Sequence, residues 1–120
     1  MKHVANWALN AASARGASYA DARIVAQRSR ALTTKNGKVG SALDSESVGM
    51  SVRVIADGAW GFAASAELGR GAVEATAAEA VAIARASARV KKEDIRLAPE
   101  KAAVAEWSTP YKIDPFSVSV

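Results

Sequence analysis

The chain has 120 residues, no cysteine, and 16 Lys and Arg against 12 Asp and Glu, for a formal net charge of +4. This length allows one compact domain, and the lack of cysteine excludes disulfides, thiolate nucleophiles and sulfur-based zinc sites. The basic residues are scattered without interleaved aromatics, which argues against nucleic-acid binding. No N-terminal apolar run resembles a signal peptide, and no window is long enough to span a bilayer. We expect a soluble, cytoplasmic protein without membrane contact.

An amphipathic helix is predicted at the start of the chain. Large apolar residues recur at helical spacing through residues 3–14, with Val4, Trp7 and Ala8 on one side. Gly16 follows at the place where a glycine in left-handed geometry ends a helix.

The middle of the chain changes to strand periodicity. Alternating apolar residues and two tight-turn dipeptides, Asn36-Gly37 and Asp57-Gly58, predict hairpins, because both central residues of such turns need positive φ. Asp44–Ser47 is read as a polar connection between strands. The sequence therefore predicts an α+β fold in which two helices pack on an antiparallel sheet of about four strands. These strands are expected at residues 20–34, 38–43, 49–56 and 60–64.

A second, alanine-rich helix should follow the strands. Ser65 is the expected N-cap with Glu67 near the positive end of the helix dipole, although Gly69 and Gly71 leave a start nearer Gly71 open. The helix should end near residues 90–92. Its predicted buried stripe is Val73, Ala77, Ala80, Val81 and Ala84.

The last part of the chain carries weak structural signals. Pro110 and Pro115 argue against regular structure, and the aromatic residues between 107 and 116 should dock on another surface. We predict an α+β domain at residues 1–100 and an extended segment at residues 101–120 that leads toward a further C-terminal part. The core should be thin, because alanine dominates the apolar residues and only a few large side chains can close it.

No catalytic residue and no metal ligand is predicted in this chain. His3 is the single histidine and stands at the N-terminus without a partner of matching chemistry. Glu74 and Glu79 lie on different sides of the second helix, so they do not form a carboxylate pair.

The segment 57–63, Asp-Gly-Ala-Trp-Gly-Phe-Ala, is the most distinctive stretch. One interpretation is a tight turn followed by core aromatics. The other is a backbone that a second group approaches closely, because a glycine between two aromatics weakens a strand. The second interpretation makes a candidate peptide-contact turn of Asp57, Gly58, Trp60, Gly61 and Phe62.

The segment 49–63, Gly-Met-Ser-Val-Arg-Val-Ile-Ala-Asp-Gly-Ala-Trp-Gly-Phe-Ala, with Asn36-Gly37 before it and Asp114-Pro115-Phe116 after it, resembles the N-terminal region of the TldD/PmbA family. Members were once called modulators of DNA gyrase and are regarded as metallopeptidases. The resemblance implies a much longer protein whose zinc is held by an H-E-x-x-x-H helix and a distant cysteine. None of those ligands matches a residue here, so zinc is implied for the full-length family member and no cofactor for this chain.

The resemblance also implies partners. Family members form dimers, including pairs of related subunits, and cleave extended peptides in an enclosed cavity. This chain would then be an N-terminal, non-catalytic domain or fragment that contacts the rest of its own polypeptide and helps to wall the cavity and the subunit interface. The alternative is a stand-alone interaction module without enzymatic activity, which pairs through sheet edges. A third interpretation follows the older family name and makes the chain a protein that binds DNA gyrase.

Overall fold

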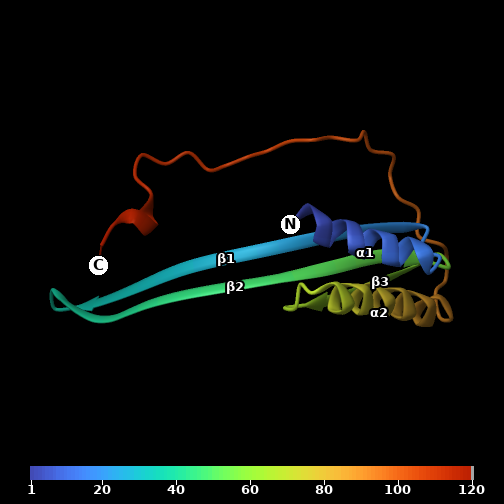
Figure 1. Ribbon diagram of the computed structural model, residues 1–120, viewed down its shortest axis with the longest axis horizontal. Helices are drawn as coiled ribbons and strands as arrows, with labels where there is room; N and C mark the ends of the chain where they lie inside the picture. Colours follow the sequence, from blue (N-terminus) through green and yellow to red (C-terminus); the bar gives the residue numbers. More distant parts are fainter. Residues whose placement is uncertain (120) are drawn as a thin grey trace. The chain divides into compact units, whose positions relative to one another are not determined.

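The computed structural model describes residues 1–119 and contains two helices, three strands and a short 3-10 turn. The strands form one sheet in the order β1-β2-β3 (Figure 1). The predicted α+β class, with two helices and an antiparallel sheet, is therefore confirmed. The elements are α1 (Lys2–Ala14), β1 (Tyr19–Lys35), β2 (Lys38–Ala56), β3 (Ala59–Ser65), α2 (Arg70–Ala88) and η1 (Pro115–Ser117).

The sheet has three strands where about four were predicted. The difference lies at Asp44–Ser47, which continues β2 and is not a connection. Polar residues of β1 and β2 face one another at this place, so each side chain has a cross-strand partner and the strand need not end. The partners are Arg28 with Glu46 at 3.3 Å, Ser29 with Ser45 at 2.7 Å and Arg30 with Asp44 at 2.8 Å.

Both predicted hairpin turns are present. Asn36 and Gly37 have φ of 52° and 72°, and Asp57 and Gly58 have φ of 51° and 73°. Two consecutive residues with positive φ define the turn whose twist matches that of the flanking strands. The second turn sets the register of β2 and β3, in which Ala56 lies opposite Ala59.

The end of α1 is as predicted. Gly16 has φ of 85°. Its N–H donates to the Ser13 carbonyl at 2.9 Å, and the Ala17 N–H donates to the Ala12 carbonyl at 3.2 Å. This pair of bonds is the Schellman arrangement, which satisfies carbonyl groups at the helix end.

The beginning of α2 differs from the first expectation. Gly69 is the N-cap and makes no side-chain capping bond. Ser65 is the last residue of β3, and its hydroxyl accepts a hydrogen bond from the Glu67 N–H at 3.0 Å. The serine therefore stabilises the turn that leaves the strand, too early to cap the helix. The alternative start near Gly71 is confirmed to within one residue.

Both helices pack on one face of the sheet. The layer between the sheet and the helices is built mostly from small side chains, and the largest fully buried ones are Val52 and Val54 of β2 with Val73 and Val81 of α2. The predicted stripe of α2 is buried as expected. The few large side chains expected to close the core lie at its margin, where the partly buried Trp7, Ile24 and Leu68 pack against it. At Gly61, α2 approaches β3 too closely to admit an aromatic ring. The core consists of Val4, Ala8, Ala11, Ala12, Met50, Val52, Val54, Ala56, Ala63, Val73, Ala77, Ala80, Val81 and Ala84.

The chain divides into two compact units. One contains Met1–Gln27 and Ser47–Leu97, and the other contains Arg28–Glu46 and the chain from Ala98 onward. The domain boundary predicted after residue 100 stays a prediction. No helix among residues 1–119 is long and apolar enough to cross a membrane.

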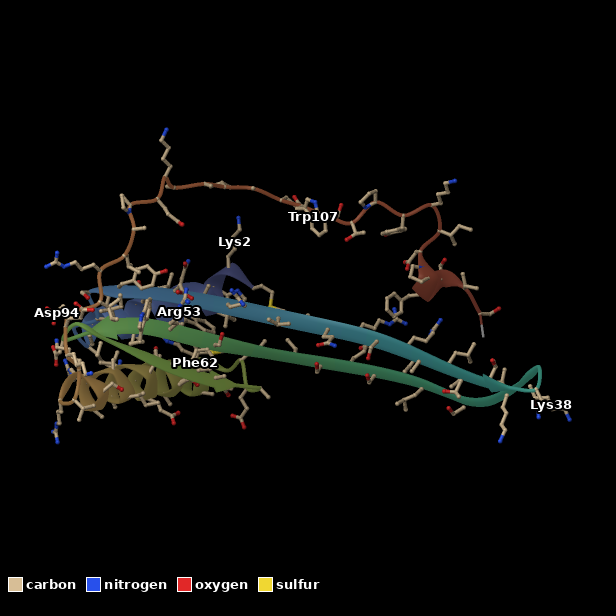
Figure 2. All side chains as sticks on the ribbon, turned by 180° about the vertical axis from the view of Figure 1, so that it is seen from behind. Lys2, Lys38, Arg53, Phe62, Asp94 and Trp107 are labelled. Atoms are coloured by element: carbon tan, nitrogen blue, oxygen red, sulfur yellow. The ribbon has the colours of Figure 1, made fainter. Side chains whose placement is uncertain are left out.

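In the second unit, residues 98–113 have no helix or strand, and Trp107 is 82% exposed (Figure 2). Pro115 begins η1 and the Asp114 side chain accepts from the Phe116 N–H. The prediction that the prolines exclude all regular structure is therefore wrong at Pro115, since proline suits the first position of a helical turn. Of the aromatic residues that were expected to dock, Phe116 lies against Arg28 and Arg30, whereas Trp107 and Tyr111 are exposed.

Candidate functional site

The five residues of the candidate peptide-contact turn lie in three different surroundings. Asp57 and Gly58 form the turn, Gly61 faces α2, and Trp60 and Phe62 point to the opposite side of the sheet. Trp60, Phe62 and Ala64 share one face, as predicted. That face is not the core, since Phe62 is 56% exposed.

The Asp57-Gly58 turn is held by the segment that follows α2. The Gly58 carbonyl accepts from the Ile95 N–H at 2.9 Å, and the Asp57 carbonyl accepts from the Lys91 ammonium group. Lys91 also pairs with Asp94 at 2.5 Å, and its hydrogen bond lowers the pKa of that carboxyl group. The residues that follow α2 therefore cover the Asp57-Gly58 turn.

Gly61 marks the closest approach between the sheet and α2. A Cβ atom on this glycine would lie 1.9 Å from the Ala80 carbonyl oxygen and 2.6 Å from the Ala84 nitrogen. The second interpretation of this segment expected a close approach to the backbone at this position. The approaching group is α2 of the same chain.

The side of the sheet opposite the helices carries a connected set of aromatic and charged side chains within the first unit. We call this set the open face, and Figure 2 marks two of its members, Arg53 and Phe62, which lie opposite each other on β2 and β3. It contains Tyr19 and Asp21 from β1, Arg53 and Ile55 from β2, and Trp60 and Phe62 from β3.

Arg53 joins the three strands of the open face. Its guanidinium group contacts the Asp21 carboxylate at 2.7 Å and 2.8 Å and lies 5.0 Å from the centre of the Trp60 ring. The hydrogen bond to Asp21 raises the pKa of Arg53, which stays charged. A cation above an aromatic ring is attracted by the electron density of that face.

Tyr19 completes this arrangement. Its hydroxyl donates to Asp21 at 3.0 Å, and its ring meets the Trp60 ring edge-on with centres 5.9 Å apart. Ile55 lies on the same face and is only 5% exposed. The open face is therefore an ordered surface in which an ion pair and two aromatic rings hold one another in place.

The sequence interpretation found Trp60 and Phe62 but missed Tyr19, Asp21 and Arg53. A signal was present, because residues two apart in a strand point to the same side. Arg53 alternates with the buried Val52 and Val54, which places it on the side away from the helices. The ion pair between β1 and β2 depends on their register, which the sequence pattern alone does not set.

A shallow hollow of about 350 Å³ continues this side of the sheet toward the end of β3. Its lining is mostly apolar. The lining residues are Arg23, Val25, Val48, Gly49, Met50, Ser51, Ala64, Ser65 and Ala66.

No group of three or more His, Cys, Asp or Glu residues within residues 1–119 is arranged to hold a metal ion. His3 packs edge-on against Trp7, with ring centres 5.0 Å apart. The described residues therefore do not fit the zinc that the family resemblance implies for full-length members.

Two antiparallel-sheet hairpins, two covering helices and a glycine packed against the second helix define a small α+β domain. Residues 20–84 match the family model for PmbA/TldA metallopeptidase domain 1. This match spans more than half of the chain. The chain therefore belongs to the PmbA/TldA metallopeptidase family.

A comparison with solved structures finds the same fold in a larger protein. It is the crystal structure of a candidate modulator of DNA gyrase from Bacteroides thetaiotaomicron, with 19% identity and a TM-score of 0.58. The match covers 88% of this chain and 24% of that protein, so the present chain spans about a quarter of its length. A comparison with curated proteins finds no match.

Proposed function

We propose that this chain serves as the N-terminal, non-catalytic domain of a TldD/PmbA-like zinc metallopeptidase that processes extended peptides. The observation that carries the proposal is the family match over residues 20–84, which spans the sheet and most of α2. In this proposal the zinc and the residues that cleave the peptide bond belong to a later part of the parent polypeptide. The parent acts as a dimer of identical or related subunits.

The open face is the part of this domain that we assign to the peptide cavity and its neighbouring interface. Its exposed Phe62 and half-buried Trp60 offer apolar area, while Arg53 and Asp21 offer paired charges. Aromatic and arginine side chains are enriched where proteins recognise partners. A surface of this composition suits an extended peptide, whose side chains alternate between apolar and polar contacts.

The test uses the full-length parent protein and a double variant, W60A with F62A. We expect a KM for extended peptides about tenfold higher, because two ring contacts are lost, and a kcat close to that of the wild type. V90A is the matched control, since Val90 is exposed outside the open face. Equal KM values for the double variant and the wild type would show that the open face does not line the cavity.

Gly61 is unsuited to that test. A larger residue there collides with α2, so its effect on cleavage would report on folding and not on peptide contact.

A second candidate function is a stand-alone interaction module without enzymatic activity. The observation that favours it is an uncovered sheet face, which binds partners in many small domains. The length and the activity of the native polypeptide distinguish the two candidate functions. The peptidase proposal requires a protein several times longer that hydrolyses peptides, while the module requires a short protein that binds a partner without cleaving it.

A further inference from the structure

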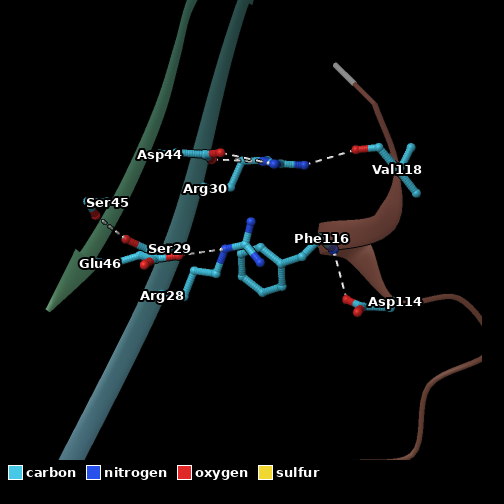
Figure 3. Close-up of polar contacts among 9 residues, drawn as sticks. All are labelled: Arg28, Ser29, Arg30, Asp44, Ser45, Glu46, Asp114, Phe116 and Val118. Carbon is cyan, nitrogen blue, oxygen red and sulfur yellow. Dashed lines mark hydrogen bonds and ion pairs between the residues drawn. The ribbon is translucent and has the colours of Figure 1, made fainter. Parts of the chain in front are cut away.

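In the second unit, the ring of Phe116 lies against two arginines of β1. The guanidinium carbons of Arg28 and Arg30 are 4.7 Å and 5.9 Å from the ring centre (Figure 3). The two arginines are two residues apart in a strand, which places them on the same side of β1. They form a cationic platform for one aromatic side chain.

Arg30 also donates a hydrogen bond to the backbone of the tail. Its Nε and Nη2 donate to the two Asp44 oxygens at 2.8 Å and 2.9 Å, and its remaining Nη1 donates to the Val118 carbonyl at 2.9 Å. This two-point contact fixes the plane of the guanidinium group. The hydrogen bond from Arg30 lowers the pKa of Asp44, so the carboxylate stays charged. The contact with Asp44 therefore orients Arg30 through groups that do not belong to the aromatic residue.

The ligand side of this contact is a short rigid turn. The Asp114 carboxylate accepts from the Phe116 N–H at 2.9 Å, and the Asp114 carbonyl accepts from both the N–H and the hydroxyl of Ser117. Pro115 occupies the first position of η1, where its fixed φ is favourable. The turn presents the Phe116 ring and the Val118 carbonyl two residues further on.

We propose that Arg28, Arg30 and Asp44 form a peptide-recognition site for turns of the type Asp-Pro-aromatic-x-Val, and that residues 114–118 are its intramolecular ligand. The preferred ligand carries an aromatic side chain two residues before a free backbone carbonyl. Residues 98–113, which lead into this ligand, have no helix or strand, so a separate peptide of the same chemistry competes with the attached one. This site is independent of the proposed peptidase function.

The test measures binding of a fluorescent synthetic peptide of residues 111–119 to the full chain by anisotropy. The F116A variant leaves the site open, so we expect it to bind the peptide about tenfold more tightly than the wild type, whose own tail competes. Adding R28A to F116A should weaken binding about two- to fivefold, the effect of one exposed cation–aromatic contact. A peptide with alanine in place of phenylalanine should bind F116A more weakly still, because it loses the contacts to both Arg28 and Arg30.

W107A is the matched control, because Trp107 is an exposed tail aromatic outside the site; it should bind the peptide as weakly as the wild type does. R28A leaves the Arg30–Asp44 pair in place, so it separates loss of the platform from damage to the hairpin. Equal peptide affinity of F116A and the wild type would overturn the proposal. It would also be overturned if R28A in the F116A background bound the peptide as tightly as F116A alone.

Discussion

Gly61 of β3 and Ala80 of α2 meet backbone to backbone, with room for a hydrogen but not for a methyl group on the glycine. This contact explains why a glycine stands between two aromatic residues. It also sets the distance between β3 and α2 at this point, where Ala80 and Ala84 of α2 lie against the glycine.

The G61A variant should be less stable than the wild type. The added Cβ overlaps the Ala80 carbonyl oxygen, and overpacking of this kind costs about 1–3 kcal/mol or more, which lowers the melting temperature by about 5 °C or more. Thermal unfolding followed by circular dichroism measures this shift. G71A is the control, since nothing lies within 4 Å of its Cβ in the first turn of α2 and alanine favours a helix. An unchanged melting temperature for G61A would contradict the packing described.

The two hairpin turns should respond differently to alanine. Gly37 and Gly58 both have positive φ, so each substitution costs about 1 kcal/mol of backbone strain. At Gly58 the new Cβ also meets Asp94 and Lys91, while at Gly37 nothing lies within 4 Å. We expect G58A to lower the urea midpoint more than G37A does. Equal midpoints would mean that the Lys91 and Asp94 side chains move away from the new Cβ without loss of stability.

The open face should contribute little to stability on its own. Arg53 and Asp21 are partly exposed, and R53A removes one exposed ion pair and one cation–aromatic contact, so the urea midpoint should fall only slightly. Urea unfolding at low and high salt measures it, and the difference between R53A and the wild type should shrink as salt rises. A urea midpoint for R53A far below that of the wild type would show instead that Arg53 is required for the stability of the fold.

The contact of Arg28, Arg30 and Asp44 with residues 114–118 should persist at mildly acidic pH. Asp44 has a lowered pKa in the folded protein because Arg30 donates hydrogen bonds to it, so the contact is complete above the ordinary aspartate pKa of about 3.9. Its contribution is lost as the pH falls through the lower, folded value. Titration of the Asp44 carboxyl carbon by NMR should show a midpoint below 3.9, with the Phe116 ring signals moving in the same range. A midpoint at or above 3.9 would contradict the arrangement, and D44N should abolish the coupled ring shift.

The sequence predicted the features that depend on local chemistry. The turns at Asn36-Gly37 and Asp57-Gly58 need positive φ, and Gly16 ends α1 for the same reason, so these positions were identifiable from residue type alone. The buried stripe of α2 followed from helical spacing.

The features that depend on pairing between distant residues were not predictable in this way. Asp44–Ser47 looks like a polar connection until Arg28, Ser29 and Arg30 are placed opposite it. Trp60 and Phe62 look like core aromatics until Gly61 is placed against α2, which turns both of them to the other side. In each case the partner lies many residues away, and the strand register decides the outcome.

The central claim, that this chain is one domain of a larger metallopeptidase, is tested most directly by the intact mass of the native protein. An antibody raised against this chain would isolate the protein from its source cells for mass spectrometry. We expect a polypeptide several times the 12.4 kDa of the present chain, which should also hydrolyse extended peptides in a zinc-dependent reaction. A native mass near 12.4 kDa would contradict it and favour the stand-alone interaction module.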